Sequence, residues 1–304
     1  MEYHMDSEES SDLNAGRTLR ERPPRYINLF TKLSIILGGF LQQMGWAFFG
    51  FGMIFFWVFV MNSEARYLLA FDGKWVNVQG TVLTVNSTSS EVNDQRIYAY
   101  EFRYLAGDET LEASSYDSYR PEIQVGKLVA VQYKSGNHKR ARIEGMSSST
   151  FPVWVAFACV FPLFGFFMII GGLLYNIKAL KLLIYGQFSK GKMIDKTITG
   201  SSVNNNYVYK YIFEFAVGGS KYQAKCSTYQ TWKVEDEAME IILYDKSDPN
   251  KSIVYDAIAG VPEITPDGRF DATPLRNASL LILPIVAIGL NILAYYLYSI
   301  FTAT

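Results

Sequence analysis

Few residues in this chain have the types and spacing that catalysis requires. Ser189 and Lys192 match a Ser-x-x-Lys pattern, in which the lysine amine would activate the serine hydroxyl as a nucleophile. That pattern works at the start of a helix in a deep cleft, whereas Gly191 begins a predicted strand. A membrane hydrolase that uses Ser189 and Lys192 is therefore the least favoured functional hypothesis.

Acidic residues occur in two groups near the end of the second polar segment. Asp245, Asp248 and Asp256 offer the oxygen ligands that Ca²⁺ prefers, but they lack the glycine and the terminal glutamate of a known calcium loop. Turn chemistry explains Asp245 and Asp248 better than metal binding does. The other group is most simply a solvated face, and it consists of Glu235, Asp236, Glu237 and Glu240.

The histidines and cysteines do not form a predicted site. His4 lies in a polar tail and His138 in a turn, and neither has the neighbours of a triad or a zinc site. Cys159 falls in an apolar run and Cys226 in a polar segment, so we expect no disulfide. The net charge of -1 gives no argument for nucleic-acid binding. The sequence thus assigns no catalytic residue, no cofactor and no metal ligand.

Alternating aromatic residues indicate the strands that would carry any binding surface. Period-two spacing places these side chains on one face of a strand in each polar segment. The residues are Tyr98, Tyr100, Phe102 and Tyr104, then Tyr209, Tyr211, Phe213 and Phe215. An aromatic face can bind a sugar or a peptide, but it is more often the core of its own domain, and we prefer that interpretation. Residues 75–145 and 187–256 are each predicted to form about five antiparallel strands, as a small barrel or sandwich.

Uncharged runs place these domains beside a membrane. Residues 151–184 are predicted to form one transmembrane helix with a juxtamembrane extension, which Gly186 ends. Residues 280–301 form another span. Residues 27–62 contain a third span preceded by an interfacial segment, although Ile27–Leu41 could also cross the bilayer. The predicted fold class is therefore an α+β membrane protein with three transmembrane helices and two small antiparallel β domains.

The remaining segments are polar or irregular. Residues 1–26 are predicted to be a disordered tail, and residues 257–277 a proline-containing connector. Gln42 and Gln43 are expected to mark the headgroup boundary, and a hydrogen bond to a neighbouring helix is the alternative. Pro162 and Pro284 lie inside the second and third predicted spans, and each is expected to bend its helix.

The two polar segments match at a fixed offset of 111 residues, which indicates a tandem repeat. Gly80 corresponds to Gly191, Tyr133 to Tyr244, and the aromatic residues correspond in register. Because one span separates the copies, they are expected to face opposite sides of the membrane. More Lys and Arg residues flank the spans on the amino-terminal side, which favours a cytoplasmic amino terminus and second β domain. The first β domain and the carboxyl terminus would then lie outside.

These motifs resemble a bacterial membrane-protein family defined by a small β domain of unknown function between membrane helices. The resemblance rests on GTV, YAYEFRYLAG and VAVQYKSGNHKRARI in the first copy, and on YVYKYIFEFAVGG and ILYDKSDPNKSIV in the second. Asn137-His138 stands where the family usually has a proline, while Asp248-Pro249-Asn250 keeps it. The family has no established activity, so the resemblance implies a multi-pass protein of the bacterial inner membrane and transfers no site residue.

Small all-β modules without cleft chemistry usually bind or scaffold. The favoured hypothesis is therefore a non-enzymatic scaffold or adaptor whose β domains contact proteins or envelope components, through exposed strand edges among other surfaces. The alternative is a subunit of an oligomeric transporter or channel, in which Gln42, Gln43 and glycine-rich faces line a pore. Expected partners are the lipid bilayer, unidentified proteins and further copies of the chain.

Overall fold

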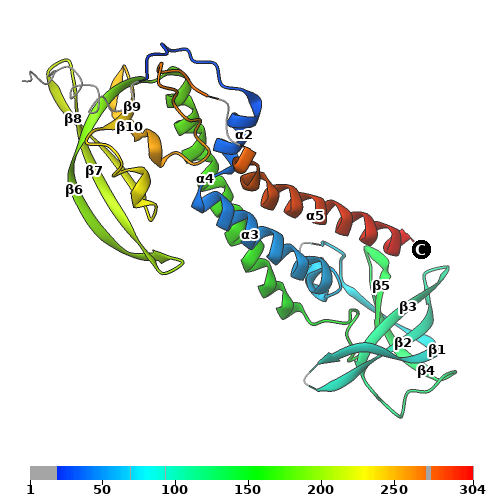
Figure 1. Ribbon diagram of the computed structural model, residues 1–304. Helices are drawn as coiled ribbons and strands as arrows, with labels where there is room; N and C mark the ends of the chain where they lie inside the picture. The colour runs from blue at the N-terminus through cyan, green and yellow to red at the C-terminus, as the bar shows by residue number, and fades with distance from the viewer. Residues whose placement is uncertain (1–18, 69, 93, 272–274, 304) are drawn as a thin grey trace, which may run out of the picture. The chain divides into compact units, whose positions relative to one another are not determined.

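The computed structural model describes residues 19–68, 70–92, 94–271 and 275–303, and the chain divides into two compact units (Figure 1). The first-sheet unit comprises Phe49–Leu163 and Leu290–Thr304. The second-sheet unit comprises Met1–Phe48 and Phe164–Gly289. Most of the predicted tail, including His4, lies outside the described residues.

Three described helical segments are long and apolar enough to cross a bilayer. They are Phe40–Val60, Val153–Tyr185 and Ser279–Ile300. Their length and composition indicate a membrane protein. Together with two five-stranded antiparallel sheets, they confirm the predicted α+β class with three apolar helices.

The first-sheet unit contains a sheet with the strand order β3-β2-β1-β4-β5. Its strands are β1 (Trp75–Val92), β2 (Gln95–Ala106), β3 (Glu109–Ser118), β4 (Leu128–Lys134) and β5 (Asn137–Ile143). The alternating aromatic residues of β2 are its core, since Tyr100, Phe102 and Tyr104 are at most 2% exposed. Full burial of one such side chain contributes about 1.5–3 kcal/mol. This stripe therefore stabilises the sheet and is not a ligand platform.

The first sheet curls until its two edge strands meet. The Ser115 hydroxyl on β3 accepts a hydrogen bond from the Ile143 amide on β5 at 2.7 Å. The Tyr104 hydroxyl on β2 donates to the carbonyl oxygen of His138 on β5. These bonds give the sheet a barrel-like form, and part of each edge is consequently covered.

The second-sheet unit repeats this layout in the order β8-β7-β6-β9-β10. Its strands are β6 (Gln187–Val203), β7 (Asn206–Val217), β8 (Ser220–Thr228), β9 (Glu240–Asp245) and β10 (Asp248–Val254). Gly80 lies opposite Tyr104 in the first sheet, and Gly191 lies opposite Phe215 in the second, an offset of 111 on both strands. Both register shifts of β1 recur in β6 at the same offset. The two sheets thus share strand order, register and irregularities.

A glycine on the central strand of each sheet allows close packing of its neighbours. A Cβ atom at Gly80 would lie 2.7 Å from Val131 Cγ2 and 2.8 Å from the Arg103 carbonyl oxygen. A Cβ atom at Gly191 would lie 2.7 Å from Ile242 Cγ1. A glycine at this position is therefore required by tight packing in both sheets.

Helices of the second-sheet unit begin with a short helix, α2 (Leu29–Leu37). The Asn28 side chain caps it by accepting a hydrogen bond from the Thr31 amide at 2.8 Å. Gly39, with φ of +84°, separates α2 from α3 (Phe40–Phe55). Because α2 has only nine residues, the segment Ile27–Leu41 does not form a separate transmembrane helix.

The segment before α2 is ordered, which corrects the predicted tail 1–26. Leu19 is fully buried and Arg25 is 3% exposed. The Arg25 guanidinium donates to the carbonyl oxygen of Leu183 at 2.9 Å, near the end of α4 (Val160–Tyr185). An arginine there satisfies a terminal carbonyl group and complements the helix dipole. The tail prediction is therefore too long at its carboxyl end.

Gln43 on α3 makes hydrogen bonds to backbone carbonyl groups of the second-sheet unit. Gln43 Nε2 donates to the carbonyl oxygens of Leu37 at 2.7 Å and Leu280 at 2.8 Å. The second carbonyl lies on α5 (Ser279–Ala303), so Gln43 bonds to a neighbouring helix, the alternative ranked second from the sequence.

As predicted, α4 ends just before Gly186, where a Cβ atom would lie 2.4 Å from the carbonyl oxygen of Leu182.

The first-sheet unit contains a π-helical and a 3₁₀-helical segment beside its α-helices. α3 continues into a π-helical turn, η1 (Phe56–Val60), and a 3₁₀ helix, η3 (Val153–Cys159), precedes α4. Pro162 therefore lies in the first turn of α4, where its missing N–H group is tolerated. Trp57 Nε1 donates to Asn291 Oδ1 at 3.0 Å, which ties η1 to α5.

Candidate functional site

Ser189 and Lys192 are not positioned to act together as a nucleophile and a base. Both residues lie on β6, three positions apart, so their side chains point to opposite faces of the strand. The Ser189 hydroxyl donates to the carbonyl oxygen of Ala216 at 3.3 Å. The Ser-x-x-Lys pattern is therefore a coincidence of spacing on a strand.

The aspartates of the β9–β10 turn act as turn residues, as predicted. Asp245 accepts hydrogen bonds from the amide and hydroxyl of Ser247 at 2.8 and 2.7 Å, and these bonds lower its pKa. Asp248 accepts a bond from the Asn250 amide at 3.3 Å, and its pKa is lowered chiefly by Lys251. Across the described ranges, His, Cys, Asp and Glu residues form no group of three that could hold a metal ion.

The predicted solvated acidic face is wrong for Glu240. Its side chain is only 1% exposed, and burial, followed by the charges of Asp256, Asp236 and Glu237, raises its pKa to about 8. When Glu240 is protonated, its carboxyl group carries no negative charge beside the carboxylate of Asp256. The offset of 111 could have revealed this burial, because Glu240 corresponds to Val129, an apolar residue that packs against the first core.

Glu235 from the same acidic run has a specific structural role. Its carboxylate accepts a hydrogen bond from the Tyr211 hydroxyl at 2.5 Å and pairs with Lys196 at 2.6 Å. The hydrogen bonds from Lys196 and Tyr211 lower the Glu235 pKa. Glu235 therefore satisfies the polar end of a buried core tyrosine.

The histidine and cysteine residues that the structure describes are His138, Cys159 and Cys226. The His138 ring packs edge-on against Tyr133, with ring centroids 5.2 Å apart. Cys159 and Cys226 are both free thiols, as expected. Burial raises the pKa of Cys226 to about 12, which leaves it protonated and poorly nucleophilic at neutral pH.

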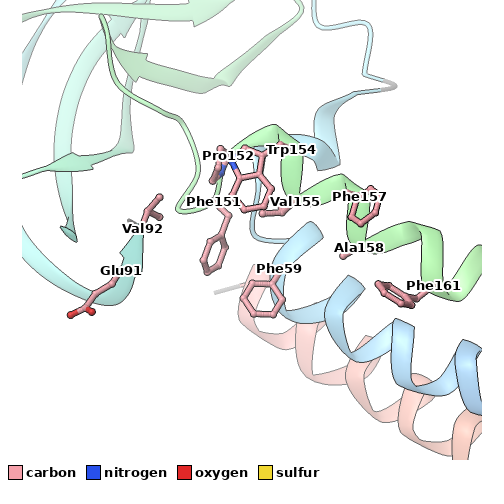
Figure 2. A pocket seen from close by; sticks show the side chains of 10 residues that line it. All are labelled: Phe59, Glu91, Val92, Phe151, Pro152, Trp154, Val155, Phe157, Ala158 and Phe161. Atoms are coloured by element: carbon pink, nitrogen blue, oxygen red, sulfur yellow. The ribbon is translucent and has the colours of Figure 1, made fainter. Parts of the chain in front are cut away.

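A cavity of about 420 Å³ in the first-sheet unit is a candidate binding site with a mainly apolar lining (Figure 2). Five aromatic side chains form most of its wall: Phe59, Phe151, Trp154, Phe157 and Phe161. The other lining residues are Glu91, Val92, Pro152, Val155 and Ala158. Most of a small apolar group would be desolvated in a space of this size and composition.

Three segments position this cavity, which we call the aromatic pocket. Phe59 lies on η1, Val92 ends the long strand β1, and most of the remaining lining belongs to η3 or to the residues just before it. The Phe59 and Phe151 rings pack edge-on at 5.2 Å, and the Glu64 amide donates to the Phe151 carbonyl oxygen at 3.2 Å. These contacts fix the start of the second span against the end of the first span.

The electrostatics of the aromatic pocket favour an apolar occupant. Glu91 is its only ionisable lining residue, and it lies 3.6 Å from Arg96 in an exposed ion pair. Trp154 and Phe157 are each 69% exposed at the beginning of an apolar span. Aromatic side chains such as Trp154 are typical of the edge of a bilayer. An anionic group would meet one carboxylate and no lysine or arginine in the lining.

Sequence reasoning did not identify this pocket. The relevant signal was the aromatic residues at the start of the second span, which were attributed to membrane crossing alone. The Glu91–Val92 contribution could not be found, because it depends on how far the β1–β2 hairpin extends beyond the part of β1 that pairs with β4.

No protein-family profile and no curated protein sequence matches this chain. The resemblance to a family of duplicated membrane β domains therefore stays a prediction. The site must be interpreted from its own residues.

Proposed function

We propose that this chain is a non-catalytic scaffold of the bacterial inner membrane, whose first β domain binds the apolar part of an envelope component. The observation that carries this proposal is the aromatic pocket, an apolar cavity at the start of a membrane span with a β-strand at its rim. The pocket offers apolar packing surface, and its lining contains no two side chains that could act as an acid and a base or as a base and a nucleophile. Such a site holds a ligand without transforming it.

The pocket is favoured over strand addition at the edges of the first sheet. The Ser115–Ile143 bond and the Tyr116–Ser147 bridge cover parts of both edge strands. A partner strand would have to displace these contacts to pair along the edge. An apolar group entering the aromatic pocket displaces only solvent or lipid.

The proposed topology places the first β domain outside and the second in the cytoplasm. It follows from the single span between the domains and from the excess of Lys and Arg on the amino-terminal side. Cysteine replacements at Ser87 and Asn204 test it in intact cells. An impermeant thiol reagent is expected to label position 87 and to leave position 204 unlabelled. Equal labelling of both positions contradicts the topology.

A photo-crosslinking amino acid at Val92 tests the binding function in the native membrane. We expect a crosslinked lipid or lipid-anchored molecule, identified by mass spectrometry, because Val92 lines the aromatic pocket. The same group at the exposed residue Val125 is the positional control. Ala158→Trp, which fills the pocket, should abolish the Val92 crosslink, whereas Leu128→Trp outside it should not. An undiminished crosslink in Ala158→Trp contradicts the proposal.

A transporter or channel subunit remains the alternative. The amide groups of Gln43 and Asn176 donate to backbone carbonyl groups of the same unit, so they are engaged in helix packing. Ion flux through liposomes that contain the purified chain would favour this alternative over the scaffold.

A further inference from the structure

A second cavity, of about 460 Å³, lies within the second-sheet unit and has a different chemistry. Its lining combines apolar residues of α3 and α4 with basic residues of β7 and β8. We call it the amphipathic cavity. The residues that matter most are Leu41, Gln42, Gly172, Asn176, Lys210 and Lys225.

The cavity lies beside the point where the uncharged part of α4 ends. On α4, the stretch from Val160 to Ile177 has no charged residue, and Lys178 is the first charge. Tyr175 and Asn176, which line the cavity, directly precede this transition. Phe40 and Leu41 are 58% and 43% exposed on an apolar span, so this side of the cavity presents an exposed apolar surface.

Two lysines form the opposite, basic side. Lys210 on β7 is paired with Ser227 on β8, and Lys225 lies two residues from Ser227, so both lysines share one face of the sheet. Diagonal neighbours of this kind lie about 7–8 Å apart, which allows both ammonium groups to reach one phosphate. No described carboxylate forms an ion pair with either lysine.

A buried polar atom of the cavity lining has no hydrogen-bond partner in the part of the chain that the structure describes. Gln42 is 1% exposed, and its Oε1 atom has no hydrogen-bond partner among the described residues. Gly172 makes room for it, because a Cβ atom there would lie 2.5 Å from Gln42 Oε1. An unsatisfied buried amide oxygen destabilises the fold unless a ligand or water bonds to it. A half-turn of the amide would present its NH₂ group, so Gln42 can pair with a hydroxyl or with an ester oxygen.

We propose that the amphipathic cavity binds an anionic phospholipid, with its phosphate between Lys210 and Lys225. The polar headgroup–glycerol region would reach Gln42, and the acyl chains would lie against Phe40 and Leu41. This arrangement pairs two free cations, satisfies the buried amide and keeps the apolar chains in the membrane. The two lysines also distinguish the second sheet from the first, because Lys210 and Lys225 correspond to the uncharged residues Ala99 and Ser114.

The full-length chain in neutral detergent tests this proposal through thermal stability and native mass spectrometry. The added probes are phosphatidylglycerol, phosphatidylcholine, glycerol phosphate and inorganic phosphate. Phosphatidylglycerol is expected to raise the melting temperature and to remain bound, whereas phosphatidylcholine and the soluble phosphates are not. An equal effect of inorganic phosphate would show a free-anion site and overturn the lipid assignment.

The double variant Lys210→Ala/Lys225→Ser gives the second sheet the residues of the first. We expect roughly 30-fold weaker binding of phosphatidylglycerol, from two lysines near a membrane surface. Lys192→Ala/Lys246→Ala removes the same charge outside the cavity and should retain binding. Gln42→Leu should weaken lipid binding while leaving the lipid-free chain as stable as before, which separates a ligand contact from a structural one. Unchanged affinity in the Lys210/Lys225 variant would refute the proposal.

Discussion

The two sheets have the same backbone plan but differ in the residues that fill it. Strand order, register and both β1 irregularities recur in the second sheet at an offset of 111 residues. The side chains at corresponding positions nevertheless differ where they meet other elements. Val129 is replaced by Glu240, and Ser115 by Cys226. The comparison shows that aromatic core and glycine positions maintain the sheet, while the positions around them are free to acquire different chemistry.

The largest expected effect tests whether the two cores are energetically equivalent. Phe102 and Phe213 are corresponding residues and are each at most 1% exposed. Replacement of either by Ala should cost about 3–5 kcal/mol of unfolding free energy in its own sheet, because it leaves a cavity. Hydrogen exchange resolved by peptide on the full chain would measure each loss separately.

The control for this pair is an exposed residue of each sheet. Leu105→Ala in the first sheet and Ile198→Ala in the second should change protection little, since both side chains are more than half exposed. A loss confined to one sheet in the Phe→Ala pair would show that the two cores are not equivalent.

An intermediate effect should distinguish the sheets by pH. The pKa of Glu240 rises from 4.5 to about 8 on folding, so the folded state binds more protons between these values. The stabilising contribution of the protonated carboxyl is fully present below pH 4.5 and is lost as the pH rises through 8. Hydrogen exchange of β9 at several pH values, corrected for the intrinsic rate, would measure this loss.

Glu240→Val, which introduces the residue of the first sheet, should remove that pH dependence. β4 of the first sheet, which carries Val129, serves as the internal reference. The assignment fails if β9 keeps the same pH dependence without the carboxyl group.

The smallest effect concerns closure of the sheet. Ser115→Ala removes the acceptor of the buried Ile143 amide and should cost about 1–3 kcal/mol, seen as faster exchange of that amide. Cys226→Ala at the corresponding position should cost less, because it deletes one buried sulfur atom and no such hydrogen bond has been identified there. Equal losses would show that the hydroxyl bond does not close the first sheet.

Much of the architecture could be predicted because its signals are local. The period-two aromatic residues predicted β2 and β7, and the uncharged runs predicted three spans. Gly186 predicted the end of α4, since a side chain there would collide with the Leu182 carbonyl group. Each of these features depends on residues that are close together in the chain.

The failures involve residues whose environment comes from distant segments. Arg25 was assigned to a solvated tail, yet it is buried against the end of α4. Gln43 was expected to mark a boundary, yet it donates to a carbonyl group on α5. A charged or amide side chain carries no local sign of the carbonyl group that will bond to it.

The sequence by itself determined the element types, the spans and the correspondence of the two sheets, because periodicity and hydropathy act over neighbouring residues. Tertiary structure alone decided which polar groups are buried and where cavities form. The aromatic pocket requires Phe59, Val92 and Trp154 to converge, and the amphipathic cavity requires Gln42 and Lys210 to do so. Convergence of segments far apart in the chain is a property of packing, and packing therefore determined both candidate sites.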